Sequence, residues 1–117
     1  MAKWLLAISL FIFLSCNREE RTWRVQYEIN LLENEQASVR AIYRNSDNAD
    51  VSESPIDDNI WRSPVYDDFK EGDEAYIRVE RLTGDADYEI SILRDGAVHE
   101  SDELKAGQTE IEVRRGI

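Results

Sequence analysis

The chain has few of the residues that hold a fold together by covalent bonds or metal ions. Its 117 residues include one cysteine, one histidine and one methionine. One cysteine excludes an intramolecular disulfide, and together with a single histidine, His99, it excludes a Cys/His zinc cluster within the chain. We therefore expect one domain of this length, held by side-chain packing alone and without a cofactor.

Basic residues are also scarce, with 14 Lys and Arg against 25 Asp and Glu, which gives a formal net charge of -11. Such a surface repels phosphate backbones, so nucleic acid is excluded as an expected partner. It repels anionic headgroups as well, so any membrane attachment has to be hydrophobic. The 42% of apolar residues argues against a fully disordered chain.

Only one long apolar run occurs, from Trp4 to Leu14, interrupted by Ser9 and preceded by Lys3. Crossing a bilayer as a helix takes about 20 apolar residues, so this run is too short to span but has the length of a secretory signal. It ends in Phe-Leu-Ser followed by Cys16. That ending resembles a bacterial lipobox, although phenylalanine stands where leucine is most usual.

The lipobox resemblance implies cleavage before Cys16 and acylation of its thiol, which would anchor the protein in a membrane of the bacterial cell envelope. It divides the chain into a signal peptide (1–15), a lipidated tether (16–21) and a domain (22–117). The segment 17–20, Asn-Arg-Glu-Glu, resembles the tag that sends Bacteroidetes lipoproteins to the cell surface, and a plain solvated tether is the alternative. An uncleaved anchor, or an ordinary signal with an incidental cysteine, stays open. The outer membrane is the expected location.

The rest of the chain alternates with period two, the signature of half-buried strands. Trp23, Val25, Tyr27, Ile29 and Leu31 fall on one face of the first segment. Turn residues then recur at short intervals, and no helical stripe of apolar residues follows. Seven strands are predicted, in the segments 23–31, 38–43, near 51, 75–80, 88–93, 98–101 and 111–113. This spacing predicts an all-β, antiparallel, Ig-like β-sandwich.

Two parts of the pattern differ in clarity. Asp95-Gly96 lies between two alternating segments and predicts a tight hairpin of type I′. The segment 61–69 is ambiguous because Pro64 cannot donate to a strand ladder. We expect loop after the weak strand near Val51, with Trp61, Val65 and Phe69 as possible core anchors.

Several features together resemble the small Ig-like lipoproteins of Bacteroidetes that are similar to the MmpS transport-accessory family. In chain order, these features are Val25-x-Tyr27-Glu28-Ile29, Ala37-Ser38-Val39 with Tyr43-x-Asn45, Trp61 with Phe69-x-x-Gly72-x-x-Ala75-Tyr76-Ile77, and Tyr88 with Ile92-x-x-Asp95-Gly96-x-Val98. Family members usually carry Leu-Pro-Trp where this chain has Asn-Ile-Trp at 59–61. The resemblance implies a sandwich that accompanies envelope or transport machinery, and it supplies no catalytic residues.

The acidic turns raise the possibility of calcium binding. Asp57 and Asp58 form one pair of carboxylates, and Asp67 and Asp68 form another. Calcium takes six to eight oxygen ligands, but the chain lacks a twelve-residue EF-hand loop, and Asp is an ordinary turn residue. A solvated acidic surface is therefore the favoured interpretation, with these four as weak calcium candidates.

Aromatic residues give the other candidate surface. Tyr66 and Tyr76 fall on expected outward faces, where they could contact a peptide or sugar, whereas Trp61 and Phe69 fit the core. His99 is expected at the surface. The chain contains no nucleophile elbow, phosphate loop or paired-cysteine motif, so no enzyme is expected.

The sequence thus favours a non-enzymatic, lipid-anchored envelope protein whose sandwich binds or supports a protein partner. The alternative is a surface module that binds a glycan or calcium.

Overall fold

The computed structural model describes residues 21–117, which form nine β-strands. The strands are β1 (Thr22–Leu31), β2 (Ser38–Arg44), β3 (Asp50–Ile56), β4 (Ile60–Arg62), β5 (Tyr66–Lys70), β6 (Glu74–Thr83), β7 (Tyr88–Arg94), β8 (Ala97–Leu104) and β9 (Glu110–Gly116). The signal peptide and Cys16 lie outside the described residues.

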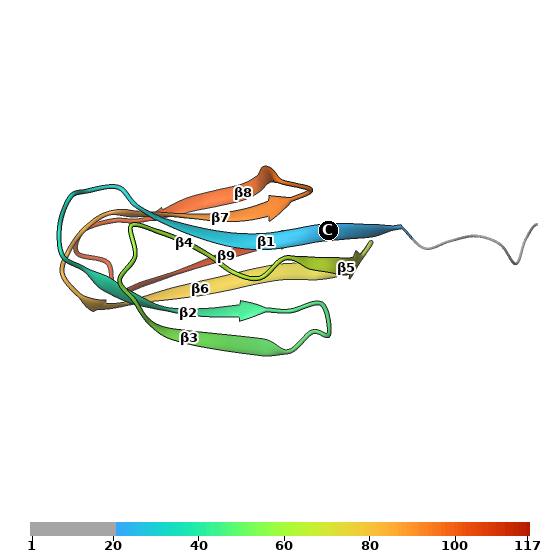
Figure 1. Ribbon diagram of the computed structural model, residues 1–117, viewed down its shortest axis with the longest axis horizontal. Coiled ribbons are helices and arrows are strands. Elements are labelled where there is room, and N and C mark those ends of the chain that lie inside the picture. Colours follow the sequence, from blue (N-terminus) through green and yellow to red (C-terminus); the bar gives the residue numbers. More distant parts are fainter. Residues whose placement is uncertain (1–20) are drawn as a thin grey trace, which may run out of the picture.

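The strands form two antiparallel sheets that pack face to face as a β-sandwich (Figure 1). The five-stranded sheet, here called sheet A, has the order β4-β1-β7-β8, and β5 also pairs with β1. The four-stranded sheet, sheet B, has the order β3-β2-β6-β9. The all-β sandwich is confirmed, with nine strands where the sequence predicted about seven.

Alternation along each strand builds the core between the two sheets. In β1, Val25, Tyr27 and Ile29 are buried and the residues between them are partly exposed. In β6, the buried Ile77 and Val79 face them from sheet B. Period-two patterning therefore places one apolar face of each sheet in the interior, and burial of that face supplies the main driving force for folding.

The additional strands come from the ambiguous middle of the chain. The expected loop after Val51 is part of the full strand β3, whose exposed Pro55 is tolerated because β3 is an edge strand. The segment 60–70 forms β4 and β5, which pair with opposite halves of β1 on either side of Pro64. Trp61 and Phe69 are buried as expected, whereas Val65 is 54% exposed and is not a core anchor.

The predicted hairpin at Asp95-Gly96 is confirmed between β7 and β8. Both residues have positive φ, 52° for Asp95 and 82° for Gly96, as a type I′ turn requires. Asp95 also accepts a hydrogen bond from the backbone N–H of Arg24 at 3.1 Å. The turn is thereby attached to the start of β1.

One hydroxyl group joins the two sheets where β2 separates from β6. The register of β2 with β6 ends at Tyr43 opposite Ile77, so Arg44 and Tyr76 would be the next pair. Instead, the hydroxyl of Tyr27 from sheet A donates to the Arg44 carbonyl at 2.7 Å and accepts the Tyr76 N–H at 3.1 Å. It satisfies two backbone groups that the ladder leaves unpaired.

Candidate functional site

Tyr76 lies on the outer face of sheet B, as expected, but it is not exposed. Its side chain is only 6% exposed because the guanidinium groups of Arg44 and Arg114 lie 5.3 and 4.6 Å from its ring centroid. Glu74 bonds both arginines, at 3.3 and 3.2 Å, and the Tyr76 hydroxyl donates to Glu112 at 3.2 Å. Long charged side chains from neighbouring strands thus cover this ring, which the sequence pattern did not indicate.

Tyr66 is partly buried and belongs to a row of aromatic rings at the β5 edge of the sandwich. Its ring centroid is 6.5 Å from that of Tyr43 and 6.3 Å from that of Phe69. Tyr43 in turn contacts Tyr27 and Trp61, at centroid distances of 5.4 and 5.5 Å. The row packs β2 of sheet B against β4 and β5 at the edge of sheet A, so the two tyrosines proposed as one contact surface lie in different environments.

Burial within this row predicts alkaline unfolding. Desolvation raises the pKa of Tyr43 from its ordinary 10.0 to about 12. A raised folded-state pKa means that the unfolded chain loses its proton first, so stability is complete below pH 10 and is lost as the pH rises towards 12. The expected loss from Tyr43 is roughly 2 to 3 kcal/mol. A pH titration followed by tyrosinate absorbance and circular dichroism checks this, and Tyr43→Phe should retain stability to higher pH. Tyrosinate formation without loss of structure would contradict it.

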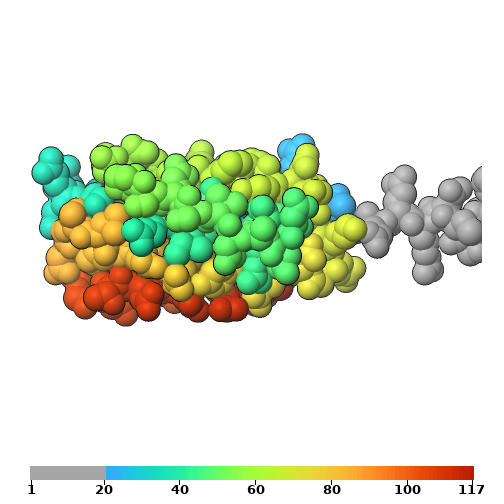
Figure 2. Space-filling view, turned by 90° about the horizontal axis from the view of Figure 1, so that it is seen from below, coloured from blue at the N-terminus to red at the C-terminus, as the bar shows by residue number. Residues whose placement is uncertain are grey.

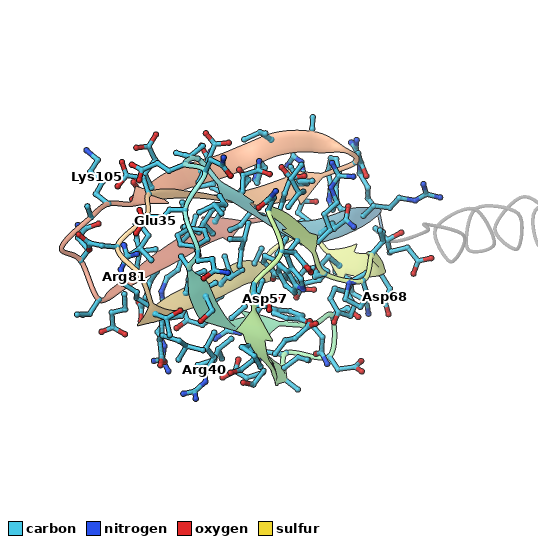
Figure 3. The ribbon with its side chains drawn as sticks, turned by 60° about the vertical axis from the view of Figure 1, so that its left-hand side comes forward. Glu35, Arg40, Asp57, Asp68, Arg81 and Lys105 are labelled. Carbon is cyan, nitrogen blue, oxygen red and sulfur yellow. The ribbon has the colours of Figure 1, made fainter. Side chains whose placement is uncertain are left out.

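The four calcium candidates do not form one site. Asp57 and Asp58 lie in the loop between β3 and β4, next to the end of β1, whereas Asp67 and Asp68 lie in β5, next to its start (Figure 3). All four are exposed. Among residues 21–117, no group of three or more His, Cys, Asp or Glu is placed to hold a metal ion.

A hollow of about 520 Å³ lies at the end of the sandwich where β1 finishes. We call this end the distal end, and the end where β1 begins the proximal end. The distal hollow lies between the β1–β2 and β3–β4 loops. It is lined by Leu31, Asn34, Glu35, Gln36, Ala37, Ser38, Pro55, Asp57, Asn59 and Thr83. Figure 2 shows the β1–β2 loop, in cyan, projecting at this end.

The walls of the distal hollow are held by close backbone contacts. The N–H of Leu31 donates to the carbonyl of Asn59 at 2.8 Å, which joins β1 to the β3–β4 loop. Gly84, with a φ of +74°, packs so tightly that a Cβ there would lie 2.7 Å from the Gln36 oxygen and 2.8 Å from the Ala37 Cβ. Only glycine combines this φ with this approach, and it fixes one wall of the hollow.

Side chains also fasten the distal loops to one another. Arg81 donates to three carbonyls, those of Gln108 at 2.9 Å, Ala86 at 2.8 Å and Lys105 at 3.1 Å. Asp85 and Asp87 accept the N–H groups of Gly107 and Ala106 at 2.8 and 2.7 Å. The distal end is consequently a preformed surface, in which these two aspartates support the loops.

Exposed apolar side chains accompany the hollow. Three large apolar side chains at the distal end are exposed: Leu32 by 48%, Ile60 by 60% and Leu82 by 40%.

A second hollow, of about 440 Å³, lies on the outer face of sheet A near the proximal end. It is lined by Arg24, Gln26, Val65, Leu93, Asp95 and Gly96. Leu93 and Ser91 are buried on the outer face of sheet A, where they alternate along β7 with the core residues Ile90 and Ile92.

Neither the spacing nor the composition of the chain indicated the distal hollow. Glu35 and Asn34 occur in a segment that reads only as a turn, and Asp57 reads as one acid among many. These residues come close together because β3 lies at the edge of sheet B and β4 at the edge of sheet A.

His99, expected at the surface, is partly exposed, and one of its ring nitrogens lies 3.0 Å from the Gly116 carbonyl oxygen.

Comparison with protein-family models and with curated proteins identifies no relative. The part of the chain from residue 21 onward contains no helix long and apolar enough to cross a membrane.

Proposed function

We propose that this chain is a non-enzymatic, lipid-anchored protein of the bacterial cell envelope, held in the outer membrane through Cys16, whose β-sandwich binds a protein partner at its distal end. In this proposal the sandwich is Ig-like, and the partner belongs to envelope or transport machinery, as the resemblance to the transport-accessory lipoproteins implies. The signal peptide and Cys16 support the anchor.

The observation that carries the proposal is the position of the hollow relative to the tether. Thr22 lies six positions after Cys16, so even a fully extended tether reaches only about 20 Å. The proximal end would then lie near the membrane. The ten residues of β1 span roughly 30 Å from there to the distal end. The distal hollow and its exposed apolar side chains would therefore face away from the lipid, towards a partner.

Photo-crosslinking in intact cells tests this function. A photoreactive amino acid at Leu32 should yield one crosslinked species of defined mass, because Leu32 lies at the distal end. The same group at Val98, which is 63% exposed on β8, should not yield it and serves as the control. Equal yields from both positions, or none from either, would contradict the proposal.

The anchor is tested in the same experiment with Cys16→Ala. That variant should take up no palmitate analogue and should lose the crosslinked species, because the sandwich is no longer held at the membrane. Labelling equal to that of the wild type would contradict lipidation at Cys16. A crosslink that persists without the lipid would contradict the role of the anchor.

The alternative function, a surface module that binds a glycan, also has support in the hollow. Its volume falls within the range of small-ligand sites, and the amides of Asn34, Gln36 and Asn59 could bond sugar hydroxyls. However, no aromatic side chain lines it, and stacking on an aromatic face is the usual further contact with a sugar. The protein partner is therefore the favoured function.

A further inference from the structure

Three arginines at the proximal end have no carboxylate partner. Arg21, Arg24 and Arg94 form no ion pair and no side-chain hydrogen bond with any residue from 21 to 117. Every other arginine in this range is bonded to a carboxylate or, for Arg81, to three backbone carbonyls. In a chain with a net charge of -11, the unpaired guanidinium groups are thus gathered where β1 begins.

Two of these guanidinium groups stack on one indole ring. Those of Arg21 and Arg94 lie 3.8 and 4.3 Å from the ring centroid of Trp23, within the range of cation–π contacts. The indole N–H of Trp23 is buried and has no hydrogen-bond partner among the described residues, which is uncommon in folded proteins. We call these three side chains the proximal cluster. Its polar groups are all hydrogen-bond donors and two of them are cationic, so their natural ligand is an oxyanion.

The carboxylates of the proximal end do not neutralise this cluster. Arg94 ends β7, which pairs with one edge of β1 (Figure 1), whereas the exposed Asp67 and Asp68 lie on β5, which pairs with the other edge. Asp95, in the turn after Arg94, accepts the backbone N–H of Arg24. None of these three carboxylates is bonded to a guanidinium group of the cluster.

The cluster also lies within reach of a membrane. Arg21 follows Cys16 by five positions, so a lipid on that cysteine would hold Arg21 within about 18 Å of the bilayer. The phosphate group of a phospholipid is an oxyanion that is present at that surface. Tryptophan is enriched at the headgroup level of membranes, and arginine binds phosphate through paired N–H groups. The composition of the cluster therefore matches the surface that it would face.

We propose that the proximal cluster binds the phosphate group of a membrane phospholipid, with Arg21 and Arg94 donating to its oxygens and Trp23 at the headgroup level. This inference rests on the proposed function, because it needs the anchor at Cys16. The acyl chains supply the attachment, and the cluster sets the orientation, with the distal hollow away from the lipid. The acidic surface elsewhere does not oppose this contact, since charges are screened beyond about 8 Å.

Quenching of Trp23 fluorescence in vesicles tests the inference. The lipoprotein matured from the full chain is reconstituted into phosphatidylethanolamine and phosphatidylglycerol with a sterol that carries a nitroxide at the headgroup level. The nitroxide should quench the wild type, and R21Q with R94Q should lower the quenched fraction by about twofold or more, because two charge-assisted hydrogen bonds are lost. Trp61 does not report on this surface, since it pairs with Ile29, roughly 20 Å further along β1.

The matched control is R40Q with K105Q, which removes the same charge from the distal half of the sandwich (Figure 3). Its quenched fraction should equal that of the wild type. Each protein is compared with itself in vesicles without nitroxide, so a changed intrinsic fluorescence does not count. Circular dichroism of R21Q with R94Q should match the wild type, because neither arginine has a bonded partner in residues 21–117.

The outcomes separate the inference from the proposed function. Equal quenching of R21Q with R94Q and the wild type would overturn the phosphate contact. Equal quenching of the wild type in vesicles of a galactolipid, which has no phosphate, would also overturn it. If Leu32 still crosslinks to a partner in cells, the proposed function stands without the contact. If quenching behaves as expected but Leu32 forms no crosslink, the phosphate contact stands and the partner at the distal end is wrong.

Discussion

Replacing Tyr27 by Phe is expected to lower the free energy of unfolding by roughly 2 to 4 kcal/mol. The substitution keeps the ring in the core and removes only the hydroxyl, which bonds the Arg44 carbonyl and the Tyr76 N–H. Each buried backbone group left without a partner costs roughly 1 to 3 kcal/mol. Urea denaturation of both proteins measures the difference.

Tyr88→Phe is the matched control for this prediction. Both tyrosines are buried, but the hydroxyl of Tyr88 has no partner in the part of the chain described by the structure. Its removal should be neutral or stabilise the protein by up to about 1 kcal/mol, because an unsatisfied hydroxyl is replaced by hydrogen. A Tyr27→Phe variant as stable as Tyr88→Phe would show that the hydroxyl of Tyr27 does not join the sheets. Hydrogen exchange at the Tyr76 amide gives a local test, with faster exchange expected in Tyr27→Phe.

Gly84→Ala is expected to destabilise the protein by about 3 kcal/mol or more. A φ of +74° disfavours any residue with a Cβ, at a cost of roughly 1 to 2 kcal/mol. The new Cβ would in addition overlap the Gln36 oxygen at 2.7 Å and the Ala37 Cβ at 2.8 Å, and overpacking of this kind costs roughly 1 to 3 kcal/mol. Thermal and urea denaturation measure the sum.

Gly107→Ala separates the two contributions. Gly107 has a similar φ of +87°, but a Cβ there meets nothing within 4 Å. It should cost only the backbone contribution, about 1 to 2 kcal/mol. If both substitutions lower the free energy of unfolding equally, the contact of Gly84 with the β1–β2 loop contributes nothing to stability.

Much of the fold follows from local pattern. The alternation from Val25 to Ile29 predicted β1 and its buried face, and Asp95-Gly96 predicted the hairpin, because both signals reside in neighbouring residues. The segment around Pro64 was not resolved by its pattern. Its two short strands exist because both halves of β1 offer an unpaired edge, which is a property of another part of the chain.

The candidate surfaces were harder to predict than the strands. Tyr76 was placed on the correct outer face, yet its exposure was wrong because Arg44 and Arg114 come from two other strands. The four aspartates proposed for calcium form two pairs next to opposite ends of β1. Exposure and clustering depend on which strands become neighbours, and strand order is not encoded in any one segment.

The sequence by itself determined the acidic balance, the single Cys16 after an apolar leader, and a chain of short strands, because composition and period two are local properties. The tertiary structure decided that Glu35 and Asp57 line one hollow and that Tyr27 joins two sheets. It also decided that Gly84 sets a wall of that hollow. These pairs of residues lie 17 to 49 positions apart in the chain, so they come together only when nonlocal strand pairing joins their segments.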